Sequence, residues 1–101
     1  MQFDESANGR EVDLSPGEEF DLLLPETPTA GYRWILRDGD SCSQLESSQL
    51  GAGKIGGLTT HVWRFRAPAS GHCSVRFEYR RSWETSSEPA RTFSLKVRVR
   101  P

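Results

Sequence analysis

The cysteines and histidines of this sequence, Cys42, Cys73, His61 and His72, are the candidates for a nucleophile and its general base. Nucleophilic catalysis needs a cysteine or serine beside a histidine base that a carboxylate orients. Cys73 alternates in phase with Val75, which predicts a small buried core residue, and His61 belongs to a similar alternating segment. His72 follows a glycine and is expected to be solvated. Cys42 could form a disulfide with Cys73 if the strands bring them together. This pattern disfavours an enzyme.

Candidate metal and phosphate sites are weak as well. The two cysteines and two histidines lack the clustered spacing of a zinc site. Acidic residues at Glu18-Glu19 and Asp38-Gly39-Asp40 coincide with turn signals and are expected to be solvated. The glycine-rich residues 51–57 lack the Lys-Ser/Thr ending of a phosphate-binding loop. We therefore expect no metal and no cofactor.

The composition is that of one soluble globular domain. The 101 residues have a formal net charge of −1, with 35% hydrophobic and 27% charged residues. This balance gives no global field to recruit nucleic acid or an anionic membrane, and no apolar run is long enough to span a bilayer. We expect a monomer with neither kind of partner. The location stays open, because an exported chain without its leader would look the same as a cytoplasmic one.

Alternating apolar residues predict an all-β sandwich of about seven antiparallel strands, with no sustained helical period. Residues 1–9 are polar and end in glycine, so we expect a loose lead-in before a single domain of residues 10–101. The expected strands contain Val12 and Leu14; Phe20, Leu22 and Leu24; Tyr32, Trp34 and Leu36; a short edge strand around Leu45; His61, Trp63 and Phe65; Cys73, Val75, Phe77 and Tyr79; and Phe93, Leu95, Val97 and Val99.

Three connections fall at one end of this sandwich if successive strands reverse direction. They are centred near Thr29, Gly56 and Trp83. The first is stiffened by Pro25 and Pro28, and the second allows close backbone approach through its glycines. The third carries a tryptophan among arginines. Because sandwich domains commonly bind through clustered loops, this end is the expected binding edge.

Two interpretations of Trp83 remain open from the residues alone. It lies past the end of a strand, so it can fold back to cover the end of the sandwich, or it can stay exposed as an interface anchor. Thr29 can likewise be a routine turn residue or part of a presented tip. Trp34 and Trp63, in contrast, have core phase.

Three motifs in this order resemble the chagasin family of cysteine protease inhibitors, and the similarity runs from about Val12 to Val99. They are residues 27–34 (TPTAGYRW), the glycine-rich segment before residues 61–67 (HVWRFRA), and residues 79–84 (YRRSWE). The resemblance implies an immunoglobulin-like sandwich that inhibits papain-like cysteine proteases reversibly, without a covalent step. Departures from the family pattern occur at Thr27, Ala30, Lys54 and Ser82.

The resemblance also implies which residues would contact a protease. The central loop would enter the catalytic cleft as a wedge, while the other two loops would contact its sides. These residues are Thr27, Pro28, Thr29, Ala30, Gly31 and Tyr32 in the wedge, Gly53, Gly56, Gly57 and Leu58 on one flank, and Arg81 and Trp83 on the other. The alternatives are a noncatalytic immunoglobulin-like module that binds another protein or a glycan through the same loops, and a structural domain of a larger assembly.

Overall fold

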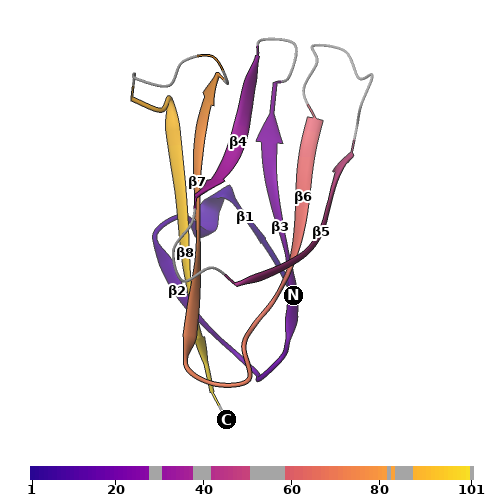
Figure 1. Cartoon of the computed structure of the whole chain (residues 1–101), viewed down its shortest axis with the longest axis vertical. Helices are drawn as coiled ribbons and strands as arrows, with labels where there is room; N and C mark the ends of the chain where they lie inside the picture. Colours follow the sequence, from indigo (N-terminus) through magenta and orange to yellow (C-terminus); the bar gives the residue numbers. More distant parts are fainter. Residues whose placement is uncertain (28–30, 38–41, 51–58, 82, 84–87, 101) are drawn as a thin grey trace.

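A computed structural model describes residues 1–27, 31–37, 42–50, 59–81, 83 and 88–100. Within these residues the chain forms eight strands and one short 3-10 helix (Figure 1). The strands are β1 (Gln2–Asp4), β2 (Arg10–Leu14), β3 (Glu19–Glu26), β4 (Tyr32–Arg37), β5 (Ser43–Leu50), β6 (Thr59–Arg66), β7 (His72–Arg81) and β8 (Arg91–Val99), and the helix is η1 (Glu5–Ala7).

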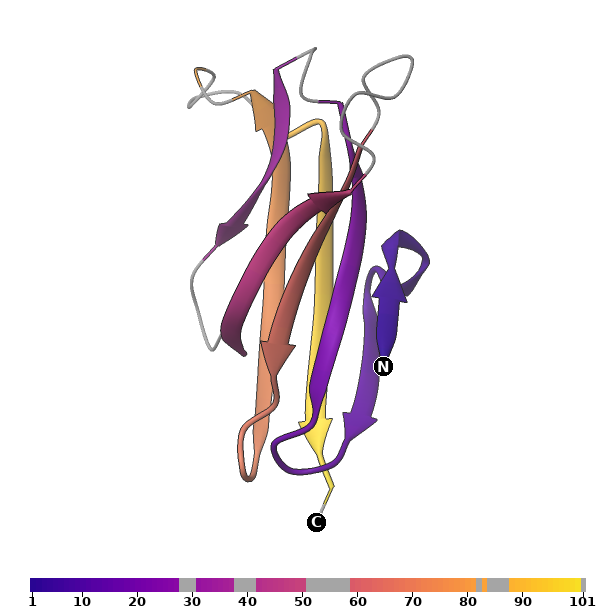
Figure 2. The same ribbon diagram turned by 90° about the vertical axis from the view of Figure 1, so that its right-hand side faces the viewer.

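The strands form two four-stranded sheets that pack face to face, so the all-β sandwich is confirmed. One sheet has the order β1-β3-β6-β5 and the other β2-β8-β7-β4. Neighbouring strands are antiparallel except in the pairs β1/β3 and β2/β8. Figure 1 shows β8, β7 and β4 to the left of β3, β6 and β5, and Figure 2 looks onto the second of these layers, with β7 and β8 behind it.

Side chains that alternate along the strands fill the space between the sheets. Strand alternation points every second residue inward, and the inward residues here are mainly aromatic and branched aliphatic. Phe20, Phe65, Phe77 and Phe93 are each no more than 1% exposed. Phe20 stacks on Phe65 with 5.5 Å between ring centroids. The expected core phase of the central strands is therefore confirmed.

The N-terminal residues are not the loose lead-in that their polarity predicted. Residues 2–4 form β1, which pairs in parallel with β3, and Phe3 packs edge-on against Phe20 at 5.9 Å between centroids. Asp4 then caps η1 by accepting from the backbone N–H of Ser6 at 2.9 Å. A single apolar residue among polar ones gives no periodic signal, which is why the sequence pattern missed this strand.

Strand β5 is longer than the short edge strand expected around Leu45. It spans Ser43–Leu50 and pairs along its length with β6. Residues 43–48 are all exposed, so neither face of this part of the strand is buried and no apolar alternation is required. Backbone pairing at the sheet edge, rather than burial, forms this strand.

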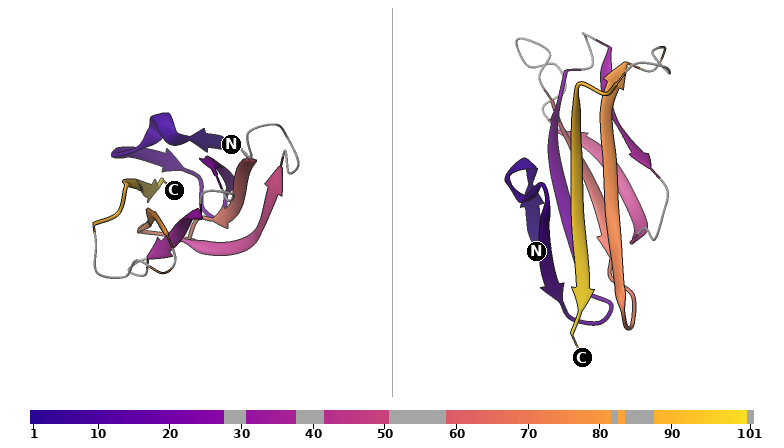
Figure 3. Two further views of the ribbon diagram at one scale, coloured as in Figure 1. Left: turned by 90° about the horizontal axis from the view of Figure 1, so that it is seen from above. Right: turned by 90° about the vertical axis from the view of Figure 1, so that its left-hand side faces the viewer.

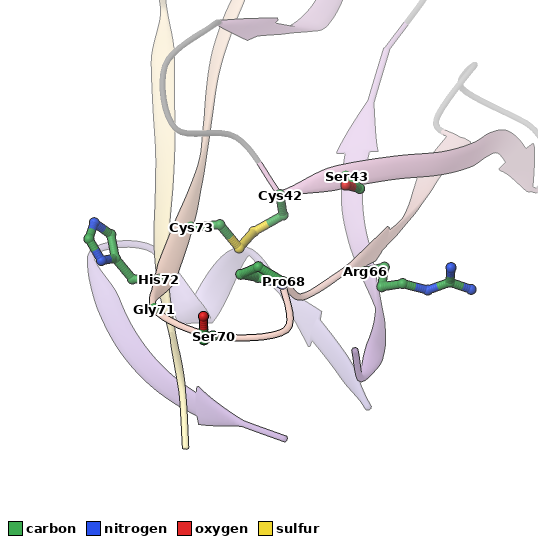
Figure 4. Close-up of a pocket in the computed structure, with 8 residues that line it drawn as sticks. All are labelled: Cys42, Ser43, Arg66, Pro68, Ser70, Gly71, His72 and Cys73. Atoms are coloured by element: carbon green, nitrogen blue, oxygen red, sulfur yellow. A yellow bond between two sulfur atoms is a disulfide. The ribbon is translucent and has the colours of Figure 1, made fainter. Parts of the chain in front are cut away.

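Cys42 and Cys73 form a disulfide, with 5.0 Å between their Cα atoms. It links the residue before β5 to β7, and so joins the two sheets (Figure 4). Cys73 is buried, as its phase predicted, and the pairing that the sequence left open is made. The bond lies beside the turn at residues 67–71, where a hollow of about 470 Å³ opens between Arg66 and His72. The predicted corner at Asp38 to Asp40 lies outside the described residues.

Candidate functional site

Six strand ends meet at the end of the sandwich opposite this turn. β3, β5 and β7 finish there, and β4, β6 and β8 begin there, as the strand pairings require (Figure 1). The three connections predicted to share an end therefore leave from one end of the sandwich. Figure 3, on the left, views the sandwich from above along its length.

Five of the predicted site residues are described, and the structure brings them together. They are Thr27, Gly31, Tyr32, Arg81 and Trp83. The other predicted site residues lie outside the described residues: Pro28, Thr29, Ala30, Gly53, Gly56, Gly57 and Leu58. The site can therefore be described from two parts. One is the base of the central connection, that is, the residues at its two ends where it leaves β3 and enters β4, and the other is the start of the connection from β7 to β8.

The first side of the base is fixed by the hydroxyl of Tyr79. It accepts from the backbone N–H of Thr27 at 2.9 Å and lies 2.9 Å from the Thr27 Oγ1 atom. Tyr79 is on β7 and only 6% exposed, so its ring is held in the core while its hydroxyl reaches the edge. The residue that opens the connection is thus tied to the opposite sheet.

Trp34 fixes the second side of the base. Its indole Nε1–H donates to the carbonyl oxygen of Pro25 at 2.8 Å, and its backbone N–H donates to Oε2 of Glu26 at 3.0 Å. β4 is an edge strand that pairs only with β7 within its sheet. Glu26, in the other sheet, supplies an acceptor for this N–H group. These bonds join the two strands that flank the connection.

Glu26 is a charged residue in a core position. Its side chain is 1% exposed, and its Oε1 atom lies 3.0 Å from Nδ1 of His61, which is itself 18% exposed. The His61 ring stacks on Trp63 with 3.8 Å between centroids and 6° between planes. Burying a carboxylate is costly unless hydrogen bonds compensate. Both carboxylate oxygens of Glu26 have such a partner.

Trp83 lies directly over Gly31. A Cβ atom built on Gly31 would be 2.5 Å from Cη2 of Trp83, and the φ angle of Gly31 is +85°. Trp83 nevertheless keeps 67% of its surface exposed. One part of the indole therefore contacts the central connection, and the rest faces solvent.

A series of stacked groups joins Trp83 to the core. The Arg81 guanidinium lies 5.9 Å from the Trp83 ring centroid and 4.7 Å from that of Tyr32. Tyr32 stacks on Tyr79 at 5.3 Å, and Tyr79 lies 4.7 Å from Trp34. Cation–π and aromatic contacts of this geometry are attractive. Together they orient two of the three connections relative to each other.

Across the part of the chain that the structure describes, no three His, Cys, Asp or Glu residues are grouped to hold a metal ion. Both cysteines of the sequence are in the disulfide, near the opposite end, so neither offers a thiol nucleophile. No helix in the described ranges has the length and apolar character to span a membrane.

Sequence reasoning missed the residues that support the site. Glu26 continues the alternation of Phe20, Leu22 and Leu24, and a charge in that phase was a detectable signal of a buried carboxylate. Tyr79 was correctly assigned to the core from the alternation of apolar residues along its strand. This alternation does not predict which group the Tyr79 hydroxyl contacts. That partner, Thr27, is 52 residues away in sequence.

Comparisons with known proteins agree on one family. The sequence family described as "Chagasin family peptidase inhibitor I42" matches residues 13–97. The chain is 30% identical to Amoebiasin-1 of Entamoeba histolytica, over 98% of this chain and 99% of that protein. It is 25% identical to Chagasin of Trypanosoma cruzi, over 91% of each.

Two solved structures have the same fold. The crystal structure of the cysteine protease inhibitor EhICP2 from Entamoeba histolytica superposes with a TM-score of 0.84 at 20% identity, covering 98% of this chain and 94% of that one. The solution structure of Amebosin gives a TM-score of 0.79 at 24% identity, covering 98% and 96%. At these identities the structural likeness is evidence of fold alone.

Proposed function

This chain belongs to the chagasin family of peptidase inhibitors, and we propose that it inhibits papain-family cysteine proteases by filling their active-site cleft with the connections at one end of the sandwich. The observation that carries the proposal is the way the central connection is held. Thr27 is fixed by Tyr79, Pro25 and Glu26 are fixed by Trp34, and Gly31 lies under Trp83.

This arrangement suits an inhibitor because order is established before binding. Immobilising a flexible loop on association costs free energy, and a loop whose ends are already fixed loses less. The wedge residues would be Thr27, Pro28, Thr29, Ala30, Gly31 and Tyr32, with Gly53, Gly56, Gly57 and Leu58 on one flank and Arg81 and Trp83 on the other. Thr27 departs from the family pattern, and its hydroxyl contact with Tyr79 supports a role for threonine in fixing the start of the wedge.

Inhibition is proposed to be reversible and noncovalent. A covalent route through an inhibitor thiol would need a free cysteine, and both cysteines of the sequence are in the disulfide. Trp83, with its exposed face, and Arg81 are of the residue types that often contribute most of the binding free energy in protein interfaces. The chain would therefore act as a monomer that binds one protease molecule and carries out no reaction itself.

A titration of papain with the purified chain tests the proposal. The titration uses a papain concentration well above the dissociation constant of the complex. Under this condition we expect the residual papain activity to fall linearly to zero at one inhibitor molecule per active enzyme molecule. Dilution should restore activity, and intact mass spectrometry should find neither a covalent adduct nor a cleaved chain. Full activity of papain and of a cathepsin-type enzyme at micromolar inhibitor would overturn it. In that case the noncatalytic binding module would be the better explanation.

A further inference from the structure

The outer face of the β2-β8-β7-β4 sheet has an excess of positive charge that the composition conceals. Its outward positions carry seven basic and three acidic side chains, which gives this face a formal net charge of +4. Because the whole chain has a formal net charge of −1, the formal charges of all other side chains sum to −5. The basic residues are Arg33, Arg37, Arg76, Arg80, Lys96, Arg98 and Arg100, and the acidic ones are Glu11, Asp13 and Glu78. The right-hand view of Figure 3 looks towards β8 and β7 of this sheet.

Like charges lie directly opposite each other on this face. The register of β4 and β7 pairs Arg33 with Arg80 and Arg37 with Arg76. Facing like charges destabilise a strand pair. Glu78 offsets part of the repulsion, with its Oε1 atom 2.9 Å from Arg37 and 2.8 Å from Arg80. The two arginine pairs therefore do not stabilise the fold by themselves.

Short hydroxyl side chains lie between these cations. A hollow of about 190 Å³ is lined by Arg37, Arg76, Thr92 and Ser94, together with Glu78, Phe77 and Phe93. A second hollow of about 420 Å³ is lined by Ser74, Lys96, Arg98 and His72, together with Glu11, Cys73 and Val97. Guanidinium, ammonium and hydroxyl groups are the donors that bind sulfate and phosphate oxygens. The face thus combines positive charge with recesses at which anionic groups can be held.

Arg76 and Lys96 are the best-placed ligands. Both are exposed, and neither has an acidic side chain within ion-pair distance among the described residues. Arg76 faces Ser94 across the β7/β8 pair, and Lys96 faces Ser74. The two cations therefore lie on adjacent strands, each beside a hydroxyl group.

We propose that this face binds a linear sulfated polysaccharide of the glycosaminoglycan class. Stacking on aromatic side chains strengthens the binding of a single-stranded nucleic acid, and buried apolar side chains strengthen binding to a membrane. The exposed large hydrophobic residues of the described chain are Met1, Leu45 and Trp83, none of which is on this face.

The centre of the proposed surface, at Arg76 and Lys96, lies away from the end that carries the inhibitory connections, whereas Arg33 and Arg80 adjoin Tyr32 and Arg81 at that end. The surface runs along the side of the sandwich, over β7 and β8, whereas those connections leave from the strand ends (Figure 1). A polysaccharide could then be bound while a protease occupies the end. This inference consequently stands whether or not the chain inhibits papain.

The test is binding of the full chain to a heparin fragment by calorimetry, at several salt concentrations from about 50 mM NaCl upwards. Arg76→Gln with Lys96→Gln should weaken binding at least about tenfold and reduce the slope of log affinity against log salt by about two. The matched control is Arg64→Gln with Arg66→Gln, which removes the same charge from the other sheet, where both arginines pair with acidic residues. It should change affinity less than about twofold.

Three results would overturn the proposal. The first is no heparin binding by the unaltered chain at low salt, and the second is an equal loss in the two double variants. The third is equal or tighter binding of desulfated heparin, of a single-stranded oligonucleotide or of phosphatidylserine vesicles, which would reject the sulfated polysaccharide as the occupant. All four substituted residues are exposed, so we expect both double variants to fold. Circular dichroism spectra and urea unfolding midpoints of the two variants check this.

Discussion

The carboxylate of Glu26 accepts a hydrogen bond of 3.0 Å from the backbone N–H of Trp34. Glu26 is the last residue of β3, and Trp34 is in β4 of the opposite sheet. The two residues are eight positions apart, on either side of the central connection. The bond therefore closes the connection across its base, between two strands that do not pair with each other. We therefore infer that the buried carboxylate has a positioning role, because it holds the backbone on both sides of the residues proposed to enter a protease cleft.

Replacing Glu26 should loosen the central connection. In Glu26→Ala the Trp34 N–H loses its acceptor and His61 loses its carboxylate partner, so we expect the free energy of unfolding to fall by about 2–3 kcal/mol. Papain inhibition should weaken about tenfold under conditions in which the variant is fully folded. Glu26→Gln, which keeps an oxygen acceptor for Trp34, should recover most of the inhibition. Urea unfolding and inhibition constants measure the two effects.

Val75→Ala is the control for a general loss of stability. Val75 is fully buried in the middle of β7, and its truncation should also cost about 2 kcal/mol. It is not part of the base of the connection, so the folded variant should inhibit like the unaltered chain. If Val75→Ala and Glu26→Ala lose inhibition equally, Glu26 has no positioning role.

The fold could be predicted because most strands bury one face. Phe20, Leu22 and Leu24 show the alternation that burial imposes, and the same holds for the central strands β6, β7 and β8. The failures lie where burial does not act. β5 is held by backbone pairing while residues 43–48 stay exposed, and β1 has only Phe3 to pack on the core.

The site could be predicted only in outline. Strand direction determined which connections share an end, but the contacts that hold them depend on residues distant in sequence. Tyr79 reaches Thr27 across 52 positions, and Cys42 reaches Cys73 across 31. The net charge of −1 similarly did not reveal the basic face, because composition cannot say that seven of the 13 Lys and Arg residues are on one face.

Trp83 should be needed for inhibition but not for folding. Its indole is 67% exposed, so Trp83→Ala removes little buried surface and should change the melting temperature by less than about 2 °C. A tryptophan anchor in an interface is worth about 2 kcal/mol or more, which corresponds to about thirtyfold weaker inhibition of papain. Leu45→Ala, which truncates an exposed residue on β5, should leave inhibition unchanged. A melting temperature that falls together with inhibition would contradict this assignment.

The disulfide should stabilise the sandwich without shaping the inhibitory end. It closes a segment of 31 residues, and loop-closure entropy predicts about 3–4 kcal/mol of stabilisation. Cys42→Ala with Cys73→Ala should therefore lower the urea midpoint strongly. The inhibition constant should stay within about twofold where the variant is folded, because the bond lies near the opposite end. An unchanged midpoint, or a weakened inhibitor that is still folded, would contradict this division of roles.

Glu78 should contribute to stability at neutral pH and not at low pH. The hydrogen bond from Arg37 holds the pKa of the Glu78 carboxyl below its ordinary value of 4.5. A lowered pKa in the folded state means that the ionised form stabilises the fold above pH 4.5, and that this contribution is lost as the pH falls below that value. Glu78→Gln should thus be less stable than the unaltered chain at pH 7, and the difference should shrink by about pH 3. A difference that is constant with pH would show that the ion pair is not responsible.

Gly31 and Trp83 should be coupled. Alanine at position 31 must adopt a φ of +85°, and its Cβ would lie 2.5 Å from the Trp83 ring, so Trp83 has to move. Gly31→Ala should cost about 1–2 kcal/mol for the backbone alone and should weaken inhibition by displacing the indole. Gly17→Ala is the matched control, since Gly17 has a φ of +72° and a Cβ placed there would have no atom within 4 Å. In the Trp83→Ala background the two alanine substitutions should cost the same, and Gly31→Ala should no longer affect inhibition. Additive effects of Gly31→Ala and Trp83→Ala on the inhibition constant would show that Trp83 does not act from its position on Gly31.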